Sequence, residues 1–519
     1  MASPPMYASV RSAAVFGIDA LPIEIEVHLE NALPGVNIVG LPDSAVKEAR
    51  ERVWAALKTS GFGFPNRRVT INLAPADLRK EGSAFDLPIA VGILAAVGRI
   101  PAERLHGTLL LGELALDGEV RPVHGVLPIA LMASREGNPT LLLPAGNAPE
   151  AALAQGVHVI PVQSLQQAVQ YLCGELKIAP YRVDVQELFE RERHYVELDF
   201  ADVRGQEQVK RALEIAAAGG HNVLMIGPPG SGKTMLARRL PGILPPLTLE
   251  EALETTKIHS VAGILPPGQA LVTARPFRAP HHTISDAALV GGGVGTVRPG
   301  EISLAHHGVL FLDELPEFAR NVLEVLRQPL EERRIVISRT KMTVEYPCNF
   351  MLVCSMNPCP CGNFGNPYRE CTCTPQQIQR YLAKISGPLL DRIDIHIEVP
   401  PVKYQELGSD RRGEPSALIR ERVVRARQRQ AERFRGIPGV YKNADMGSRE
   451  LQRFCRLDER GRQLLQTAMQ RLGLSARAYD RILKVARTIA DLEGADAIAP
   501  HHLAEAIQYR SLDRQYWNA

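Results

Sequence analysis

The chain has 519 residues, of which 45% are hydrophobic and 23% are charged, and its formal net charge is +3. This length exceeds one hydrophobic core and predicts about three domains of ordinary globular composition. The small net charge does not by itself indicate a nucleic-acid partner. No stretch reaches the roughly 18 apolar residues that span a bilayer, and the first residues lack a signal-peptide pattern.

Residues 1–175 mix short β-rich runs, such as VTINLA and VHVIPV, with helical stretches such as DSAVKEARERVWAALKTSG. This mixture predicts an α+β or α/β domain. The charged segment 176–199 is interpreted as a linker or a connecting helix.

Residues 200–405 repeat the order helix, apolar strand, glycine-rich loop and helix, which predicts a parallel sheet covered by helices. The polar, turn-rich run GSDRRGEPS then marks a boundary. Residues 415–515 have helical periodicity throughout and are expected to form a helical domain. The fold class is therefore α/β, with a helical C-terminal part.

The run VLMIGPPGSGKTMLARRL contains GxxxxGK[ST] between an apolar strand and a helix. Its backbone N–H groups are expected to wrap phosphates, with the lysine reaching the β- and γ-phosphates and the threonine binding Mg²⁺. The ATP-binding residues would be Gly227, Pro228, Pro229, Gly230, Ser231, Gly232, Lys233 and Thr234.

About eighty residues later, GVLFLDELPEF predicts a buried strand that ends in Asp313 and Glu314. The first acid could hold Mg²⁺ and the second could polarise the attacking water. Many strands end in acidic turns, so the acid pair alone is weak evidence for a catalytic role. The phosphate loop upstream is what makes that role convincing.

These motifs resemble the AAA+ ATPases over residues 200–515. The resemblance implies a sensor role for Asn357, which ends MLVCSMNP. It also implies an arginine finger at Arg392 that acts on the neighbouring subunit's nucleotide, and a second sensor at Arg477 that reaches the γ-phosphate of its own chain. The alternatives are a strand cap, a surface ion pair and a partner of the helix dipole, respectively.

The segment ARPFRAPHHTISDAALVGGG resembles the Mg-chelatase ATPase subunits and, more distantly, the MCM helicases. In those groups a β-hairpin before the first sensor projects into the pore of a ring. RRIVISRTKMTVEYPC is similar to that hairpin, and Arg339 and Lys341 are the candidates for DNA-backbone contacts. A solvated hairpin turn is the alternative.

The N-terminal motif KEGSAFDLP, followed by GELALDGEVRPVHGVLPIALMA, resembles the Lon-type protease domain. Ser83 falls at the position of the catalytic serine, but Leu127 stands where the catalytic lysine is expected. Without that base, protease chemistry is not expected. The domain is interpreted as a Lon-like fold that serves binding or assembly.

Over nearly its full length the chain resembles the YifB/ComM family, which implies a hexameric, ATP-driven branch-migration helicase that acts on single-stranded or branched DNA in natural transformation. The rival interpretations are a chelatase-type motor that remodels a protein partner and an ATP-switched DNA-binding scaffold. A Lon-like protease is the rival that Leu127 argues against.

The loop 359–373 reads CPCGNFGNPYRECTC and holds four of the eight cysteines. Cys359, Cys361, Cys371 and Cys373 could close a tetrahedral zinc site, although their spacing within each pair is tighter than usual. A redox-labile or metal-free cluster is the alternative. The other four cysteines are scattered without framework spacing, so a reducing cytoplasm is expected, where clustered cysteines more often bind metal than form disulfides. The pairs His281–His282 and His306–His307 are interpreted as loop structure or as pore and interface contacts.

Overall fold

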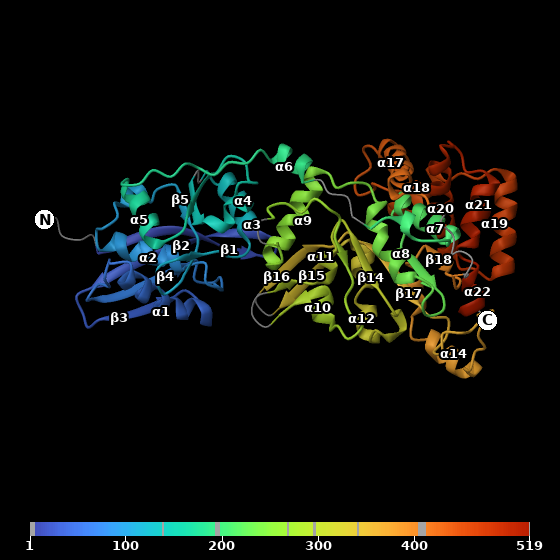
Figure 1. Cartoon of the computed structure of the whole chain (residues 1–519), viewed down its shortest axis with the longest axis horizontal. Helices are drawn as coiled ribbons and strands as arrows, with labels where there is room; N and C mark the ends of the chain where they lie inside the picture. The colour runs from blue at the N-terminus through green and yellow to red at the C-terminus, as the bar shows by residue number, and fades with distance from the viewer. Residues whose placement is uncertain are drawn as a thin grey trace.

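The computed structural model describes residues 6–137, 140–192, 198–266, 269–293, 297–339, 342–402 and 412–517. The described residues form an N-terminal domain built on a mixed sheet, a parallel α/β core and a helical C-terminal part (Figure 1). The α/β fold class is confirmed. The N-terminal domain and the C-terminal helices lie at opposite ends of an elongated molecule (Figure 1).

Within the described part of the chain, the N-terminal sheet has seven strands in the order β3-β4-β2-β1-β5-β8-β9. The strands are β1 (Tyr7–Phe16), β2 (Asp19–Glu30), β3 (Gly35–Val39), β4 (Arg68–Ala74), β5 (Thr108–Leu110), β8 (Thr140–Pro144) and β9 (His158–Val162). β1, β2 and β4 pair antiparallel, whereas β1, β5, β8 and β9 run parallel. The principal helices are α1 (Ser44–Thr59), α2 (Asp86–Ala96), α3 (Val126–Arg135) and α5 (Leu165–Cys173).

Among the described residues, the core sheet has five parallel strands in the order β11-β14-β17-β10-β18. They are β11 (Phe277–Arg278), β14 (Val309–Leu312), β17 (Met351–Met356), β10 (Val223–Ile226) and β18 (Ile395–Glu398). All residues of β10, β14 and β17 are buried, because helices cover both faces of a parallel sheet. The carboxyl ends of these strands therefore meet at one edge, where ligands bind in open α/β sheets.

Helices and a hairpin surround this sheet. They are α7 (Glu207–Gly219), α8 (Lys233–Arg239), α9 (Leu249–Ala262), α10 (Asp286–Val290), α11 (Glu301–Leu304), α12 (Arg320–Glu324), α13 (Arg327–Glu332), the hairpin β15 (Arg334–Arg339) and β16 (Met342–Pro347), α14 (Pro375–Leu382) and α15 (Gly387–Leu390).

The C-terminal helices pack on the core through α7. They are α17 (Ser416–Arg433), α18 (Ser448–Phe454), α19 (Glu459–Leu472), α20 (Ala476–Glu493), α21 (Pro500–Gln508) and α22 (Leu512–Tyr516). Both α17 and α20 lie against α7. The buried His221 ring joins the two parts, with Nδ1 2.7 Å from Asp394 Oδ2 and Nε2 2.7 Å from the Thr488 hydroxyl of α20.

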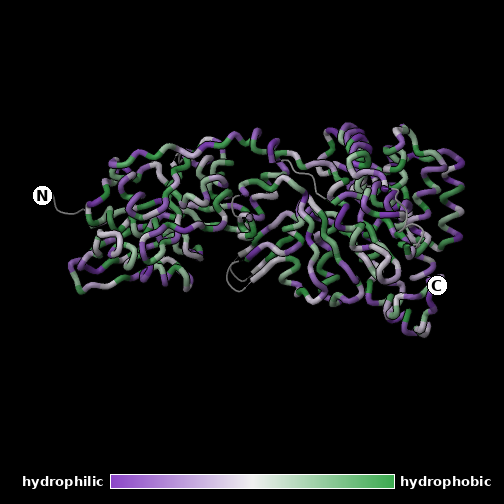
Figure 2. Tube along the Cα trace, in the orientation of Figure 1, coloured by the Kyte–Doolittle hydropathy of each residue, from purple (hydrophilic) through white to green (hydrophobic). Residues whose placement is uncertain are grey.

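Helix α17 is largely hydrophilic, as Figure 2 shows, yet several of its arginines contact the core or α20. Arg422 forms an ion pair with Glu214 of α7 at 2.6 Å, and Arg433 pairs with Asp491 of α20. These arginines therefore serve the packing of α17 against the core and α20.

The segment expected to be a linker contains a packed helix, α6 (Val185–Arg191). Its buried side chains Val185, Leu188 and Phe189 join a hydrophobic cluster that also contains Leu127 and Leu271. This helix is therefore part of the contact between the N-terminal domain and the core. Among the described residues, no helix is both long and apolar enough to cross a membrane.

Candidate active site

The phosphate loop leaves β10 at the carboxyl edge of the core sheet. Gly232 has φ +92°, a left-handed conformation that glycine adopts without a Cβ clash, and α8 begins at the next residue. The Lys233 ammonium donates hydrogen bonds to the carbonyl oxygens of Gly227 at 2.7 Å and Pro228 at 2.9 Å. The Lys233 side chain therefore folds back over the loop that is expected to bind the phosphates.

The acid at the end of β14 meets the loop directly. The Thr234 hydroxyl donates to Asp313 Oδ2 at 2.8 Å, so the hydroxyl and carboxylate expected to hold Mg²⁺ lie together. The Ser355 hydroxyl donates to Asp313 Oδ1 and accepts from the Glu314 N–H at 3.3 Å. Sequence reasoning missed Ser355, and the signal that could have found it is a polar residue inside the apolar strand β17.

Asn357 follows β17, which lies between β14 and β10 in the sheet. Its Oδ1 is 3.3 Å from Lys233 Nζ, so the sensor position meets the phosphate loop. Burial lowers the pKa of Lys233 to about 8, and the carboxylates Asp313 and Glu314 oppose this shift. The strand order thus brings together four of the predicted residues, which come from three separate segments of the sequence.

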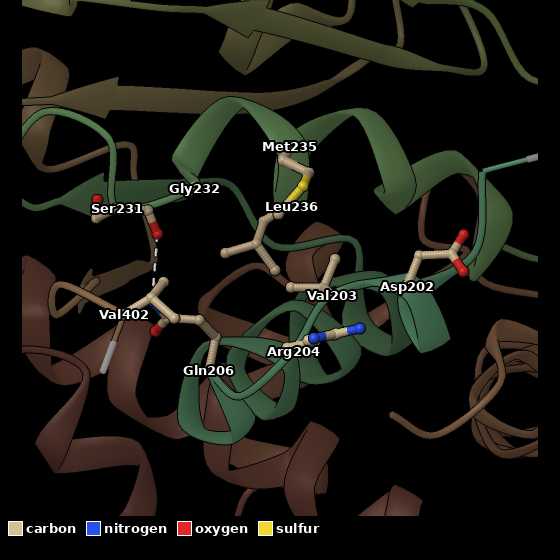
Figure 3. A pocket seen from close by; sticks show the side chains of 9 residues that line it. All are labelled: Asp202, Val203, Arg204, Gln206, Ser231, Gly232, Met235, Leu236 and Val402. Atoms are coloured by element: carbon tan, nitrogen blue, oxygen red, sulfur yellow. Dashed lines mark hydrogen bonds between the residues drawn. The ribbon is translucent and has the colours of Figure 1, made fainter. Parts of the chain in front are cut away.

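A cavity of about 260 Å³ adjoins the phosphate loop. In Figure 3, Met235 and Leu236 of α8 face the segment that precedes α7, and the Gln206 amide donates to the Ser231 carbonyl at 3.2 Å. The lining residues are Asp202, Val203, Arg204, Gln206, Ser231, Gly232, Met235, Leu236 and Val402. The mixture of apolar side chains and backbone groups suits a flat heterocycle next to the phosphates.

The two predicted arginines have different partners within the chain. Arg477 of α20 donates to Asp391 Oδ2 at 3.0 Å, and Arg392 donates to the Pro388 carbonyl at 2.6 Å and pairs with Glu331. The Arg477 side chain is 64% exposed, whereas that of Arg392 is 12% exposed. The expected reach of Arg477 to the phosphate loop of its own chain is not what the structure shows, because the docking of α20 on α7 directs it to Asp391.

The four cysteines of the loop 359–373 converge. The Sγ atoms of Cys359, Cys361 and Cys371 are 3.4–3.7 Å apart, and all four ligand sulfurs, including that of Cys373, lie within 4.8 Å of one another. Tetrahedral Zn–S bonds of about 2.3 Å separate sulfurs by about 3.8 Å, so these distances fit a zinc ion. All eight cysteines lie in the described ranges and are free thiols.

This cysteine loop rests on the phosphate loop. Gly362 has φ +81°, and a Cβ there would lie 2.5 Å from Pro229 Cδ and 3.8 Å from Asn357 Cγ. Only glycine allows this approach, so the cysteine loop packs directly against the phosphate loop of the expected nucleotide site.

The second histidine pair meets two carboxylates of α9, which spacing alone did not reveal. His306 Nε2 and His307 Nε2 lie 3.2 and 2.7 Å from Glu254 Oε2, and His307 Nδ1 lies 3.3 Å from Glu251. Hydrogen bonds from both rings hold the pKa of Glu254 well below its usual range. Because Asn349 N–H donates to His306 Nδ1 at 2.9 Å, the neutral ring carries its proton on Nε2 and is a hydrogen-bond donor, not a metal ligand.

The two Lon-like positions have different contacts. The Ser83 hydroxyl donates to Glu113, while Leu127 is fully buried in the cluster that joins the domain to α6 and α9. The Leu127 N–H donates to Glu150 Oε1 at 2.9 Å, and the Ser260 hydroxyl of α9 donates to the same oxygen. Leu127, at the position where the catalytic lysine is expected, is therefore part of a contact between the N-terminal domain and the core.

The hairpin is anchored at its base, where the Tyr346 hydroxyl donates to the Val297 carbonyl at 2.5 Å. Its strands pair from Arg334↔Pro347 onward. Of the predicted DNA contacts, Lys341 and the side chain of Arg339 lie outside the described residues.

The parallel core, the phosphate loop, the acid pair and the sensor strand together define an AAA+ protein of the Mg-chelatase type. Three family models match the chain: magnesium chelatase, subunit ChlI, over residues 199–407; subunit ChlI of Mg-chelatase over 25–147; and magnesium chelatase, subunit ChlI C-terminal, over 413–510. Membership of this class implies an ATPase.

Similar proteins identify the family within this class. The chain is 48% identical over 513 residues to competence protein ComM of Haemophilus influenzae, with 98% of each chain covered, and 46% identical over 507 residues to YifB of Escherichia coli, with 97% of each covered. It is also 27% identical over 184 residues to Lon protease 2 of Bacillus subtilis, which covers 32% of this chain and 33% of that protein. The chain belongs to the YifB/ComM family.

Proposed function

We propose that this chain is a cytoplasmic, Mg²⁺-dependent, ring-forming ATPase that moves DNA, acting in branch migration during natural transformation. The observation that carries the proposal is the full-length similarity to a competence protein. The contacts that join the expected ATP-site residues of this chain support it. The free cysteines support a reducing compartment.

ATP would bind with its phosphates on the loop of Lys233 and its base in the adjoining cavity. Thr234 and Asp313 would hold Mg²⁺, which neutralises phosphate charge when bound. Glu314 would orient the attacking water, and Asn357 would contact the γ-phosphate. The polar contacts among these groups support this assignment.

Arg392 would complete the site of the neighbouring subunit. Arg392 directly follows Asp391, which pairs with the exposed Arg477, and this position supports a contact with the neighbouring chain. Arg477 would reach the γ-phosphate of its own chain after a side-chain rearrangement from Asp391. Activity would then require an oligomer, for which a hexamer is the family's expected form. The basic tip of the hairpin, Arg339 and Lys341, would contact the DNA backbone.

ATP turnover with and without branched DNA tests the proposal. Branched DNA should stimulate the wild type, less at high salt because phosphate contacts release counterions, and Lys233→Ala should be inactive. A rate of ATP turnover that DNA does not change would favour a motor that remodels a protein partner. Nucleotide-controlled DNA binding without turnover would favour a switched scaffold.

We also propose that the four cysteines hold one structural zinc ion. Metal analysis of protein purified without chelator should give about one zinc per chain. Cys371→Ser should lose the metal, whereas Cys173→Ser, far from the loop in the sequence, should retain it. Four titratable thiols in metal-free protein would contradict the zinc assignment.

A further inference from the structure

The cysteine loop, residues 359–373, has almost no apolar core of its own. Of residues 360–373, all of which the structure describes, only Gly362 is buried. The buried Cys359 sulfur accepts a hydrogen bond from the Phe364 N–H at 3.3 Å, and the Cys373 sulfur accepts one from the Cys361 N–H at 3.3 Å. The fold of this loop therefore depends on its sulfurs, and the proposed zinc ion would stabilise it.

The buried glycine of this loop lies against the ATP site. A Cβ added to Gly362 would come within 2.5 Å of Cδ and 2.8 Å of Cγ of Pro229 in the phosphate loop. The same Cβ would lie 3.8 Å from Cγ of Asn357, whose Oδ1 is 3.3 Å from Lys233 Nζ. A shift of Gly362 would therefore disturb both the phosphate loop and the expected sensor.

The phosphate loop has room to move where the cysteine loop does not contact it. A cavity of about 330 Å³ lies between the two loops and the end of β18, and Pro228, Phe364 and Pro400 are among the residues that line it. A cavity offers no protein atoms that would oppose a displacement. The packing of Gly362 on Pro229 is therefore the support of the phosphate loop on this side.

The cysteine loop is also joined to the C-terminal helices. The Phe364 ring makes an edge contact with Tyr516 of α22, with the ring centroids 6.3 Å apart and the planes at 68°. Helix α22 in turn contacts the core sheet, because Asp513 Oδ1 lies 2.6 Å from His396 Nδ1 of β18. A cysteine loop whose sulfurs are held together is thus a fixed support between α22 and the phosphate loop.

We infer that the cysteine loop is a metal-dependent support for the phosphate loop, so that zinc and ATP bind to this chain with positive cooperativity. This inference rests on the proposed zinc site and the proposed ATPase, and it adds regulation of the ATP site by zinc occupancy. Both ligands favour the arrangement in which Gly362 packs on Pro229. Linkage requires that each ligand raise the affinity for the other by the same factor.

Equilibrium binding measures this coupling in both directions. A fluorescent, non-hydrolysable ATP analogue should bind the zinc-loaded chain about tenfold more tightly than the chain stripped of zinc by a zinc-selective chelator. In the reverse titration, saturating analogue should raise the affinity for zinc, measured against a competing chelator, by the same factor. If the affinity for each ligand does not depend on the other, the inference is wrong.

Gly362→Ala tests the contact with the metal in place, and so remains decisive if the zinc-free chain does not stay folded. The added Cβ should displace Pro229 and weaken binding of the analogue about tenfold, while zinc content stays at about one per chain. Gly365→Ala is the matched control, because Gly365 lies in the same loop with φ +74° and an added Cβ there would meet nothing within 4 Å. It should match the wild type in both measurements, and equal affinities in the two variants would refute support through Gly362.

Failure of the underlying proposals gives different results. A chain that binds the analogue but no zinc would exclude the zinc site, and the coupling with it. A chain that binds zinc but no nucleotide would exclude the ATPase and, again, the coupling. Only a chain that binds both ligands independently would overturn the coupling alone.

Discussion

At the scale of single residues, the ATP site assembles at the carboxyl ends of β14, β17 and β10. Asp313 and Asn357 follow the neighbouring strands β14 and β17 and meet Thr234 and Lys233 of the loop that follows β10. Ser355 completes the arrangement by holding Asp313 from inside β17. Arg392 and Arg477 differ from these residues. Within one chain they pair with carboxylates, such as Glu331 for Arg392, whereas the proposed function has them contact phosphates of ATP.

Arg392→Ala should abolish ATP turnover and leave nucleotide binding intact. An arginine finger contributes a factor of about 10³ to 10⁵ to the rate but does not contact the nucleotide of its own chain. Turnover assays together with equilibrium binding of a fluorescent ATP analogue check this. Arg460→Ala, on the exposed side of α19, is the matched control; near-normal turnover in Arg392→Ala would show that the finger is misassigned.

At the scale of elements, helix α9 is the main contact between the N-terminal domain and the core. Its Ser260 hydroxyl reaches Glu150, its Lys257 pairs with Asp19 at 2.6 Å, and its Glu254 takes hydrogen bonds from the histidines before β14. One helix therefore links the Lon-like domain to the strand that carries Asp313.

Glu150 gives this contact a measurable pH dependence. Burial raises the pKa of Glu150, although hydrogen bonds from Ser260 and the Leu127 N–H oppose the shift. The unfolded chain therefore releases this proton at lower pH than the folded chain, so the free energy of unfolding falls as pH rises from about 4.5 until the folded pKa is passed.

Glu150→Gln should lack this fall and become more stable than the wild type as pH rises towards neutrality. Glu150→Ala should instead lose about 1–3 kcal/mol, because a buried N–H and hydroxyl lose their acceptor. Thermal unfolding at several pH values measures both, with the exposed Glu103→Gln as control. Parallel wild-type and glutamine curves would refute the effect.

The turn between β1 and β2 lies against the hairpin. Gly17 has φ +63°, and a Cβ there would lie 2.9 Å from Val344 Cγ1 of β16. Gly17→Val should displace the turn, so the stimulation of ATP turnover by DNA should fall severalfold while basal turnover remains. Gly61→Val carries similar backbone strain, about 1–2 kcal/mol, with nothing within 4 Å, and should keep the stimulation. Equal loss in both variants would mean that strain alone is responsible.

At the scale of the whole molecule, the C-terminal helices pack on the core, where Arg477 of α20 contacts Asp391, the residue before Arg392. The N-terminal domain lies at the far end (Figure 1). Under the proposed function, a neighbouring chain supplies Arg392 to each ATP site. Only the oligomer would then be active.

Turnover per chain should therefore rise with protein concentration over the range in which light scattering detects assembly. Arg392→Ala should assemble but show no such rise, since it lacks the group supplied across the interface. Constant turnover per chain in a preparation that stays monomeric would exclude a shared site.

The sequence by itself predicted the residues of the proposed ATP site, because a phosphate loop, a strand ending in two acids and a strand ending in asparagine each need only a few adjacent residues. It also predicted the α/β class and the loss of the protease lysine. Only the tertiary structure decided that Leu127 lies in a contact between domains, that Arg477 turns to Asp391, and that Ser355 faces the acid pair. These contacts join strands and helices far apart in the chain, and their geometry follows from strand register and helix docking, which local sequence patterns do not encode.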